Sequence, residues 1–207
     1  TGILDIKSPA DVGWGVELID LDNDGHLDLV LANGSTIEDE LTLEVLKDPK
    51  LLPQKCRLLR NDGNTNFIDI SKSGGRFFRR DLITRGLACA DYDQDGRVDV
   101  AIVLHSGEGT LLKNDSKETG NWLQVKLAGT TSNRFGIGAK IEVNVGANTY
   151  TRQCVLSSSY LSSQSLIRHF GLGKAEEADS VTVHWPSGKT TTQKNVKLNQ
   201  QITIQEE

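Results

Sequence analysis

The stretch GVELIDLDNDGHLDLVLANG, residues 15–34, contains the pattern from which the fold of this chain can be worked out. Asp20, Asp22, Asp24 and Asp28 stand on alternate positions, and a histidine fills the one gap between them. Apolar residues alternate before the aspartates and continue after them, as they do in short β-strands. Carboxylates this close repel one another, so the stretch predicts either a bound cation or an acidic turn that points into water.

The same pattern returns 71 residues on, from Asp20 to Asp91, in GLACADYDQDGRVDVAIVLHSG at 86–107. RLLRNDG (57–63) is similar to TLLKNDS (110–116), and FIDISKS (67–73) is similar to ILDIKS (3–8). Each copy reads as short strands separated by glycine turns, which is typical of the blades of a β-propeller. The predicted strands are 15–19, 27–32 and 57–61 in the first copy, and 86–90, 98–104 and 109–113 in the second.

Two such blades cannot close a ring, and ILDI (3–6) looks like the last strand of an earlier unit. The chain also contains no methionine. We therefore expect a processed chain or an excised fragment, whose remaining blades belong to a larger parent chain. An insert at about 35–55 interrupts the first copy. Within it, IEDELTLEVLKDPKLL (37–52) predicts a short helix ended by Pro49 or Pro53, or else a surface loop without a role.

After residue 121 the sequence changes character and predicts a second unit. Its apolar and polar residues alternate in five segments, which are separated by Gly, Asn or Pro-Ser-Gly turns. We expect an all-β chain in which blades at 1–116 are followed by a small β-sandwich or barrel at 121–205, with a linker at 114–120. The five segments are NWLQVKLAG, AKIEVNVG, TYTRQCVL, DSVTVHWPSGK and QQITIQ.

The charge of the chain is divided unevenly between these two parts. Residues 1–120 carry 14 Lys and Arg against 22 Asp and Glu, a net charge of −8, whereas residues 121–207 carry 9 against 6, a net charge of +3. This balance argues against nucleic acid as a partner of the first part. No apolar run reaches the length of a membrane helix, so no membrane insertion is expected.

The two acidic loops share the spacing DxDxDGxxD, which favours a calcium site in each. Carboxylates at positions 1, 3, 5 and 9 and a backbone carbonyl at position 7 supply hard oxygen ligands, while the glycine at position 6 permits the sharp turn. Position 12 is Leu31 or Ile102 rather than Glu, and the flanks are β-patterned, so the loops are not EF-hands. Solvated acidic turns remain the alternative. The predicted calcium ligands are Asp20, Asp22, Asp24, His26 and Asp28 in loop 1, and Asp91, Asp93, Asp95, Arg97 and Asp99 in loop 2, with His26 and Arg97 acting through their carbonyls.

These loops resemble the calcium loops of FG-GAP/VCBS repeats, which occur in integrin α-chain propellers and bacterial surface proteins. Further motifs follow in order: NWLQVKLAG, SNRFGIGAKIEV, YLSSQSLIRHFGLG, VTVHWPSGK and NQQITI. Together they resemble the ASPIC/UnbV domain that follows FG-GAP blades in the cartilage acidic protein family and its bacterial relatives. The resemblance implies an extracellular or cell-surface propeller protein, stabilised by calcium and used in adhesion or protein binding.

Other candidate residues are better explained by structural roles than by catalysis or ligand binding. The run SSSYLSSQS (157–165) lacks a nucleophile elbow and is expected to be a polar strand edge or loop. The four histidines form no metal-ligand spacing. A Cys56–Cys89 disulfide is left open, and a buried thiol is expected at Cys89. Two glycosylation sequons begin at Asn33 and Asn114 and also fit ordinary turns. Solvated faces are expected for Arg134, Lys140, Arg152 and Arg168, and an anion-binding patch is the alternative.

The predicted function is a non-enzymatic, calcium-dependent module, secreted or at the cell surface, that serves adhesion or protein–protein interaction. Its expected partner is a protein or a surface glycan, and both calcium ions are expected to be structural. The alternatives are a polysaccharide-active hydrolase or a carbohydrate-binding module with structural calcium, and a part that only completes a larger propeller. A hydrolase would need a further pair of carboxylates facing a cleft, and the only acidic cluster outside the loops is Glu38, Asp39 and Glu40.

Overall fold

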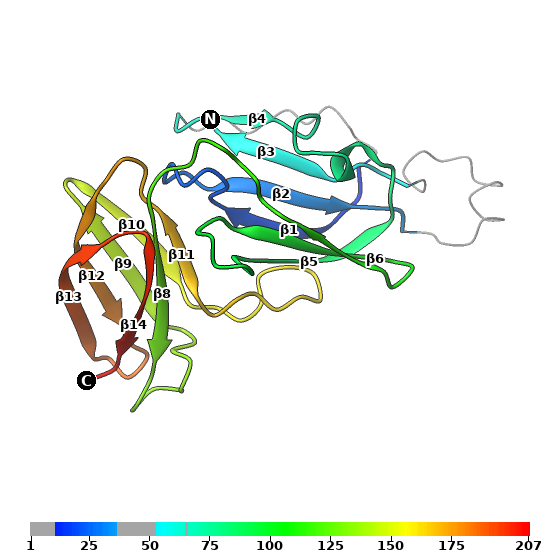
Figure 1. Cartoon of the computed structure of the whole chain (residues 1–207). Helices are drawn as coiled ribbons and strands as arrows, with labels where there is room; N and C mark the ends of the chain where they lie inside the picture. The colour runs from blue at the N-terminus through cyan, green and yellow to red at the C-terminus, as the bar shows by residue number, and fades with distance from the viewer. Residues whose placement is uncertain (1–10, 37–52, 65) are drawn as a thin grey trace.

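The computed structural model describes residues 11–36, 53–64 and 66–207, and Figure 1 shows their arrangement. The strand expected at 3–6 and the helix expected at 37–52 lie outside the described residues. In the described part, the strands form four open sheets and none of the sheets closes into a barrel. The prediction of an all-β chain is therefore confirmed, and the barrel alternative for the second unit is wrong.

The first sheet is a four-stranded antiparallel meander with the order β1-β2-β3-β4. The first acidic loop connects β1 to β2, so the sheet positions both ends of that loop. Val30 and Ala32 of β2 are fully buried, because their side chains point to the same face of the sheet, and this face packs into the core. The four strands are β1 (Gly13–Ile19), β2 (Asp28–Asn33), β3 (Arg57–Asn61) and β4 (Phe67–Asp69).

The second sheet repeats this plan with β5 (Thr84–Ala90), β6 (Asp99–Leu104) and β7 (Gly109–Leu112) in an antiparallel order. The second acidic loop connects β5 to β6. The two sheets meet at their first strands, where Gly15 lies so close to β5 that an added Cβ would come within 2.6 Å of the Leu87 Cβ. A 3-10 helix at Phe77–Arg79 buries two phenylalanines in the shared core.

The second part of the chain is a sandwich of two sheets. One sheet has the order β11-β8-β14, in which β14 runs parallel to β8, and the other has the order β10-β9-β12-β13. One apolar cluster fills the space between them, and Phe170, Ile141 and Ile204 are fully buried there. The strands are β8 (Trp122–Ala128), β9 (Lys140–Val145), β10 (Asn148–Gln153), β11 (Arg168–Gly171), β12 (Glu177–His184), β13 (Thr190–Lys197) and β14 (Gln200–Gln205).

The carboxylate of Glu206 ties one end of the sandwich together. It accepts hydrogen bonds from the backbone N–H groups of Thr130, Thr131 and Ser132 at 2.6–2.8 Å, and from the hydroxyls of Ser132 and Ser187. Burial raises the pKa of this carboxyl, but the hydrogen bonds outweigh burial and lower it to about 2. Glu206 therefore stays ionised and holds two loops at the same end of the domain.

The strands expected at 15–19, 57–61 and 86–90 all appear, with boundaries that differ by no more than two residues. Two strands of the sandwich escaped the sequence analysis. The first, β11, has only four residues, and the second, β13, is a polar run in which only Thr191 and Val196 are buried. Neither has the apolar alternation by which a strand is identified.

The serine-rich segment 157–165 of the second part lies along the first strands of the two meanders, and Figure 1 shows it in yellow beside β5. Both β1 and β5 are edge strands, so each leaves backbone N–H groups without a strand partner. The segment supplies those partners from its side chains. The bonds run from Val16 N to Ser159 Oγ (3.1 Å), from Leu87 N to Ser162 Oγ (3.0 Å) and from Cys89 N to Gln164 Oε1 (2.9 Å).

Candidate metal centre

The two acidic loops fold in the same way, contact for contact. In loop 1 (20–28) the first aspartate, Asp20, accepts the N–H of Asp24 at 3.1 Å and that of Gly25 at 2.9 Å. In loop 2 (91–99) Asp91 accepts the corresponding N–H groups, also at 3.1 and 2.9 Å. The first carboxylate of each loop therefore closes the turn on itself.

Each turn requires a positive φ at two of its positions. The residue at position 4 has a positive φ, 57° at Asn23 and 61° at Gln94. The glycine at position 6 has φ 96° at Gly25 and 87° at Gly96, which is a conformation that glycine adopts at no steric cost. The spacing of the motif is thus explained by the backbone as well as by its carboxylates.

The fourth aspartate of each loop joins it to the neighbouring strand. Asp28 accepts the N–H of Leu21 at 2.9 Å and that of Asn61, at the end of β3, at 2.8 Å. Its counterpart Asp99 accepts the N–H of Tyr92 at 3.2 Å and that of Asn114 at 2.7 Å. Both carboxylates are almost completely buried. Position 9 therefore holds the loop in place whether or not it also contacts an ion.

The structure brings together part of each predicted ligand set. In loop 1, carboxylate oxygens of Asp20, Asp22 and Asp24 all lie within 4.8 Å of one another. In loop 2, the group is Asp91, Asp93 and Asp99, so the aspartate at position 9 takes the place of the one at position 5. The remaining predicted ligands, Asp28, Asp95 and the carbonyls of His26 and Arg97, stay a prediction.

Loop 1 accumulates negative charge where water is scarce. Burial, together with the charges of the neighbouring aspartates, raises the pKa of Asp20 to about 7. Burial likewise raises the pKa of Asp28 to about 6, and it raises the pKa of Asp22. Among the described residues, the buried Oδ1 of Asp22 has no hydrogen-bond partner. A buried carboxylate oxygen without a donor, inside a group of three carboxylates, is the environment that a divalent cation would satisfy.

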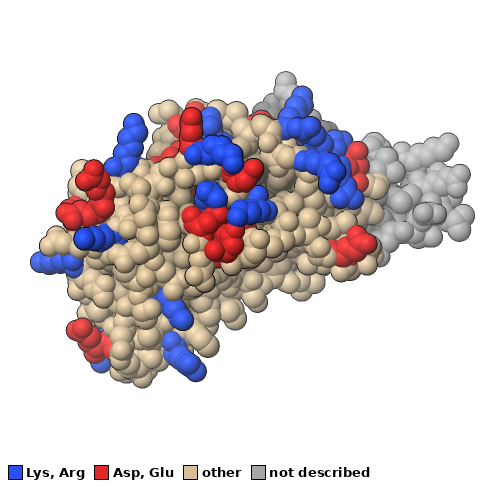
Figure 2. Space-filling model, in the orientation of Figure 1, with Lys and Arg blue, Asp and Glu red and all other residues tan. Residues whose placement is uncertain are grey.

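Loop 2 has basic side chains of its own. Arg97 pairs with Asp95, and Lys113 pairs with Asp93 and, at 3.3 Å, with Asp95. Although burial opposes the effect, the N–H of Arg97 and the ammonium of Lys113 lower the pKa of Asp95. Burial raises the pKa of Asp99. Figure 2 shows the wider pattern, in which acidic side chains gather on the middle of the displayed face with basic ones directly beside them.

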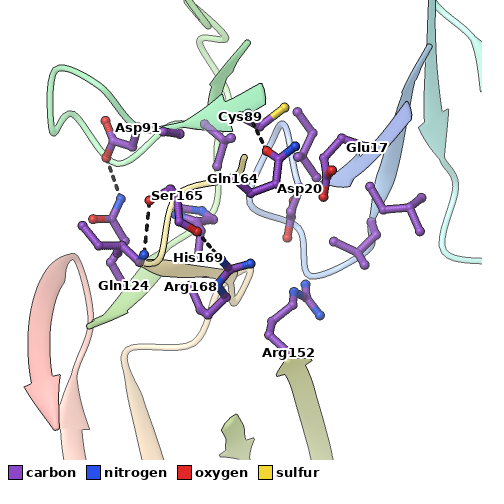
Figure 3. Close-up of a pocket in the computed structure, with 16 residues that line it drawn as sticks. Glu17, Asp20, Cys89, Asp91, Gln124, Arg152, Gln164, Ser165, Arg168 and His169 are labelled. Carbon is purple, nitrogen blue, oxygen red and sulfur yellow. Dashed lines mark hydrogen bonds between the residues drawn. The ribbon is translucent and has the colours of Figure 1, made fainter. Parts of the chain in front are cut away.

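The sandwich domain contacts both loops. Gln124 of β8 donates its amide N–H to the Asp91 carboxylate at 2.7 Å, and Figure 3 shows this bond. His169 of β11 lies 2.7 Å from the Asn23 Oδ1 of loop 1, and the N–H of Gly173 donates to the Asn23 carbonyl at 2.8 Å. The acidic loops therefore form part of the interface between the two halves of the chain.

A cavity of about 100 Å³ lies beside the loops, and its wall includes Asp20, Asp91, Arg152, Arg168 and His169. Figure 3 shows Arg152 rising from β10 toward this space. Burial, and next the charge of Arg152, lowers the pKa of His169 to about 4, so its ring is neutral near pH 7. The expectation that Arg152 and Arg168 lie on solvated faces is wrong, because the cavity and the domain interface enclose them.

Three residues of this site were not singled out by the sequence analysis for their roles at the loops: Asn23, Gln124 and His169. Asn23 stands at a loop position that the calcium motif leaves free, and its side chain is 1% exposed. Gln124 is a polar residue between the apolar Leu123 and Val125 of a predicted strand, and this position is the one signal in the sequence that could have pointed to its role. The structure shows that it is buried. His169 was noted only as one of four scattered histidines.

The remaining candidates have structural roles. Cys56, Cys89 and Cys154 are all free and buried, so the Cys56–Cys89 disulfide left open above is absent. Asn33, in the first sequon, is buried and donates its amide N–H to the Lys55 carbonyl at 2.9 Å. Asn114, in the second, donates to the Leu21 carbonyl at 2.8 Å. Neither amide is free for glycosylation in the folded chain.

Comparisons with known proteins identify a family resemblance in the sandwich domain and relatives that cover more of the chain. Residues 129–207 match the family described as ASPIC and UnbV. Cartilage acidic protein 1 from Homo sapiens is 26% identical over 97% of this chain, and the protein of the same name from Mus musculus is 25% identical over 89%. The Xenopus tropicalis protein is 34% identical over 52% of this chain.

The chain is much shorter than these relatives, since the matches span 37%, 35% and 17% of the human, mouse and frog proteins. What a whole relative does is therefore not automatically a property of this segment. In the described residues, no helix combines the length and the apolar character needed to cross a lipid bilayer.

Proposed function

We propose that this chain is a calcium-stabilised, non-enzymatic binding module in which each acidic loop holds one calcium ion. One observation carries the proposal: the two loops repeat the same turn and the same carboxylate hydrogen bonds, and each gathers three acids that include positions 1 and 3 of the motif. Solvated turns have no need to conserve such a geometry within one chain.

The ligand chemistry favours calcium over other cations. Each cluster offers carboxylate oxygens alone, without a histidine or cysteine side chain, and calcium takes six to eight oxygen ligands. The buried, unpartnered Oδ1 of Asp22 fits such an ion. When bound, calcium would supply positive charge that cancels the repulsion among the aspartates, and its role would be to hold the hairpin loops rather than to react.

We propose further that the two meanders are blades of a larger β-propeller of the FG-GAP/VCBS type. Three features support this: the matching strand order, the loop between the first two strands of each sheet, and the packing of β1 against β5. The length of the relatives leaves room for additional blades.

The proposed setting is extracellular, and the proposed partner is a protein or a surface glycan. The similarity to cartilage acidic protein 1 supports this assignment by analogy only. Screening sugars and esters for turnover tests the non-enzymatic part of the proposal. A rate that disappears when one carboxylate outside the loops is changed would overturn it.

The decisive experiment is a calorimetric titration of calcium into chelator-treated protein, with thermal melts of the same samples. We expect two sites and a melting temperature that rises with calcium, because a ligand that binds only the folded chain stabilises it. Magnesium serves as the control cation and should bind more weakly. A folded protein that binds no calcium at millimolar concentration would contradict the proposal.

A further inference from the structure

We infer that the sandwich domain sets the calcium affinity of both loops, with Gln124 as the positioning residue for loop 2 and His169 as the positioning residue for loop 1. The inference rests on the proposed calcium sites. It extends that proposal, because it gives the sandwich domain a defined role: its docking and the binding of calcium are one coupled event.

The contact with loop 2 is direct. The Oδ2 of Asp91 accepts two hydrogen bonds, one from the N–H of Gly96 inside the loop at 2.9 Å and one from Gln124 at 2.7 Å. Gln124 is 5% exposed, so its amide has little freedom to turn away. It therefore fixes the orientation of a carboxylate that belongs to the metal cluster, as outer-shell residues do in metal sites.

The contact with loop 1 runs through Asn23, which is the point where three parts of the chain meet. Its amide N–H donates to the Gly96 carbonyl of loop 2 at 2.9 Å. Its Oδ1 is therefore the acceptor toward His169, so the Nε2 of that ring carries the proton. Its own carbonyl accepts the N–H of Gly173 at 2.8 Å. Asn23 lies between Asp22 and Asp24 in the sequence, so these hydrogen bonds also fix the position of two aspartates of the cluster.

Close backbone contacts make the docking specific. A Cβ added at Gly171 of β11 would lie 2.0 Å from the Asp20 Oδ2, so only glycine permits the strand to approach this carboxylate. The linker takes part as well, because the N–H of Gly120 donates to the Asp22 carbonyl at 2.8 Å. The linker and the sandwich thus contact the backbone of loop 1 at two successive residues, Asp22 and Asn23.

Coupling between two binding events acts equally in both directions. If the docked sandwich arranges the carboxylates for calcium, then calcium must favour the docked state by the same factor. Without calcium, the aspartates repel one another, and this repulsion weakens the hydrogen bonds that Gln124 and Asn23 make across the domain interface. We therefore expect calcium to tighten the domain interface and to shield the linker.

The test measures calcium affinity by calorimetry for each loop separately, in chains whose other loop is weakened by Asp22→Asn or Asp93→Asn. We expect Gln124→Leu to weaken calcium binding at loop 2 by roughly 10-fold, in the range seen when outer-shell partners of metal ligands are removed. We expect His169→Leu to do the same at loop 1, while His169→Gln, which keeps an N–H donor, restores most of the affinity.

Two matched controls separate positioning from general damage. Gln201→Leu changes the residue paired with Gln124 in the parallel ladder, and His184→Leu changes an exposed histidine elsewhere in the sandwich. Both should leave calcium affinity unchanged. In addition, trypsin cleavage after Lys117 in the linker should slow when calcium is added to the wild type, and much less so in Gln124→Leu.

The outcomes are distinguishable. If the wild type binds no calcium, the proposed function fails and this inference fails with it. If the wild type binds two ions, but Gln124→Leu and His169→Leu bind them with unchanged affinity, only the inference is overturned. If His169→Leu fails to fold, His169→Gln still tests the inference. A loss of calcium affinity at loop 1 of roughly 10-fold in His169→Gln, which keeps an N–H donor, would contradict the role of the hydrogen bond to Asn23.

Discussion

The two acidic loops have the same backbone but different surroundings. Loop 1 buries its charge against the sandwich domain, with the pKa of Asp20 raised to about 7. It contains no basic residue beyond His26 within its nine positions, and the charge of Arg60 acts on Asp22 from outside the loop. Loop 2 instead pairs its acids with Arg97 and Lys113. The difference shows that a repeated motif specifies a turn, while the neighbours of the turn decide how strongly it requires an external cation.

The largest expected difference between the loops comes from removing the aspartate at position 3. Asp22→Asn should weaken calcium binding at loop 1 by about 100-fold. The change neutralises a carboxylate of the cluster, and this carboxylate includes the buried oxygen that has no hydrogen-bond partner. Asp93→Asn should weaken loop 2 by a smaller factor, since Lys113 already pairs with that carboxylate. Site-resolved calorimetry checks this order, and an equal loss at both loops would contradict the comparison.

The glycines at position 6 should differ in the free energy of unfolding. Alanine at either position must adopt a positive φ, which costs about 1–2 kcal/mol. At Gly96 the added Cβ would also lie 2.0 Å from the Trp122 Nε1, whereas at Gly25 the nearest atom is the Cε1 of Tyr150 at 2.8 Å. Gly96→Ala should therefore destabilise the chain more than Gly25→Ala. Urea unfolding of both variants measures the difference, and Gly107→Ala, where the Cβ would meet nothing within 4 Å, controls for φ alone.

The basic side chains of loop 2 should compete with calcium. Lys113→Ala should raise the calcium affinity of loop 2 by about fivefold at low salt, because it frees Asp93 and Asp95 from an ion pair. The gain should shrink as salt is added. Lys194→Ala on β13, which makes the same change in net charge, is the control, and a similar gain there would show that only overall charge matters.

The smallest effect expected is the dependence of loop 1 on pH. Since Asp20 and Asp28 have pKa values raised to about 7 and about 6, part of the calcium-free population holds a proton that calcium must displace. Affinity should therefore fall as pH falls, by about fourfold between about pH 7.5 and about pH 6.5. Calorimetry in buffers of different ionisation enthalpy would detect the released proton. Binding at loop 1 without proton release would contradict the raised values.

Much of the fold can be predicted from the sequence by itself. The repeat of DxDxDGxxD, flanked by alternating apolar residues, identifies both loops and nearly every strand of the two meanders, because strand alternation and glycine turns are local properties. The charge division and the ordered motifs after residue 121 likewise distinguish the second unit. The same local rules cannot find β13, because its polar residues acquire strand geometry only by pairing with β12.

Only the tertiary structure decided what surrounds each loop. The sequence assigns Asn23 and Gln94 to equivalent positions, yet one is buried at the junction of three segments and the other is exposed. Likewise, Gln124 and His169 reach the loops only because β8 and β11 lie against them, although 33 and 146 residues separate each from its partner. Burial and long-range hydrogen bonds depend on how distant segments pack, and no local pattern encodes that packing.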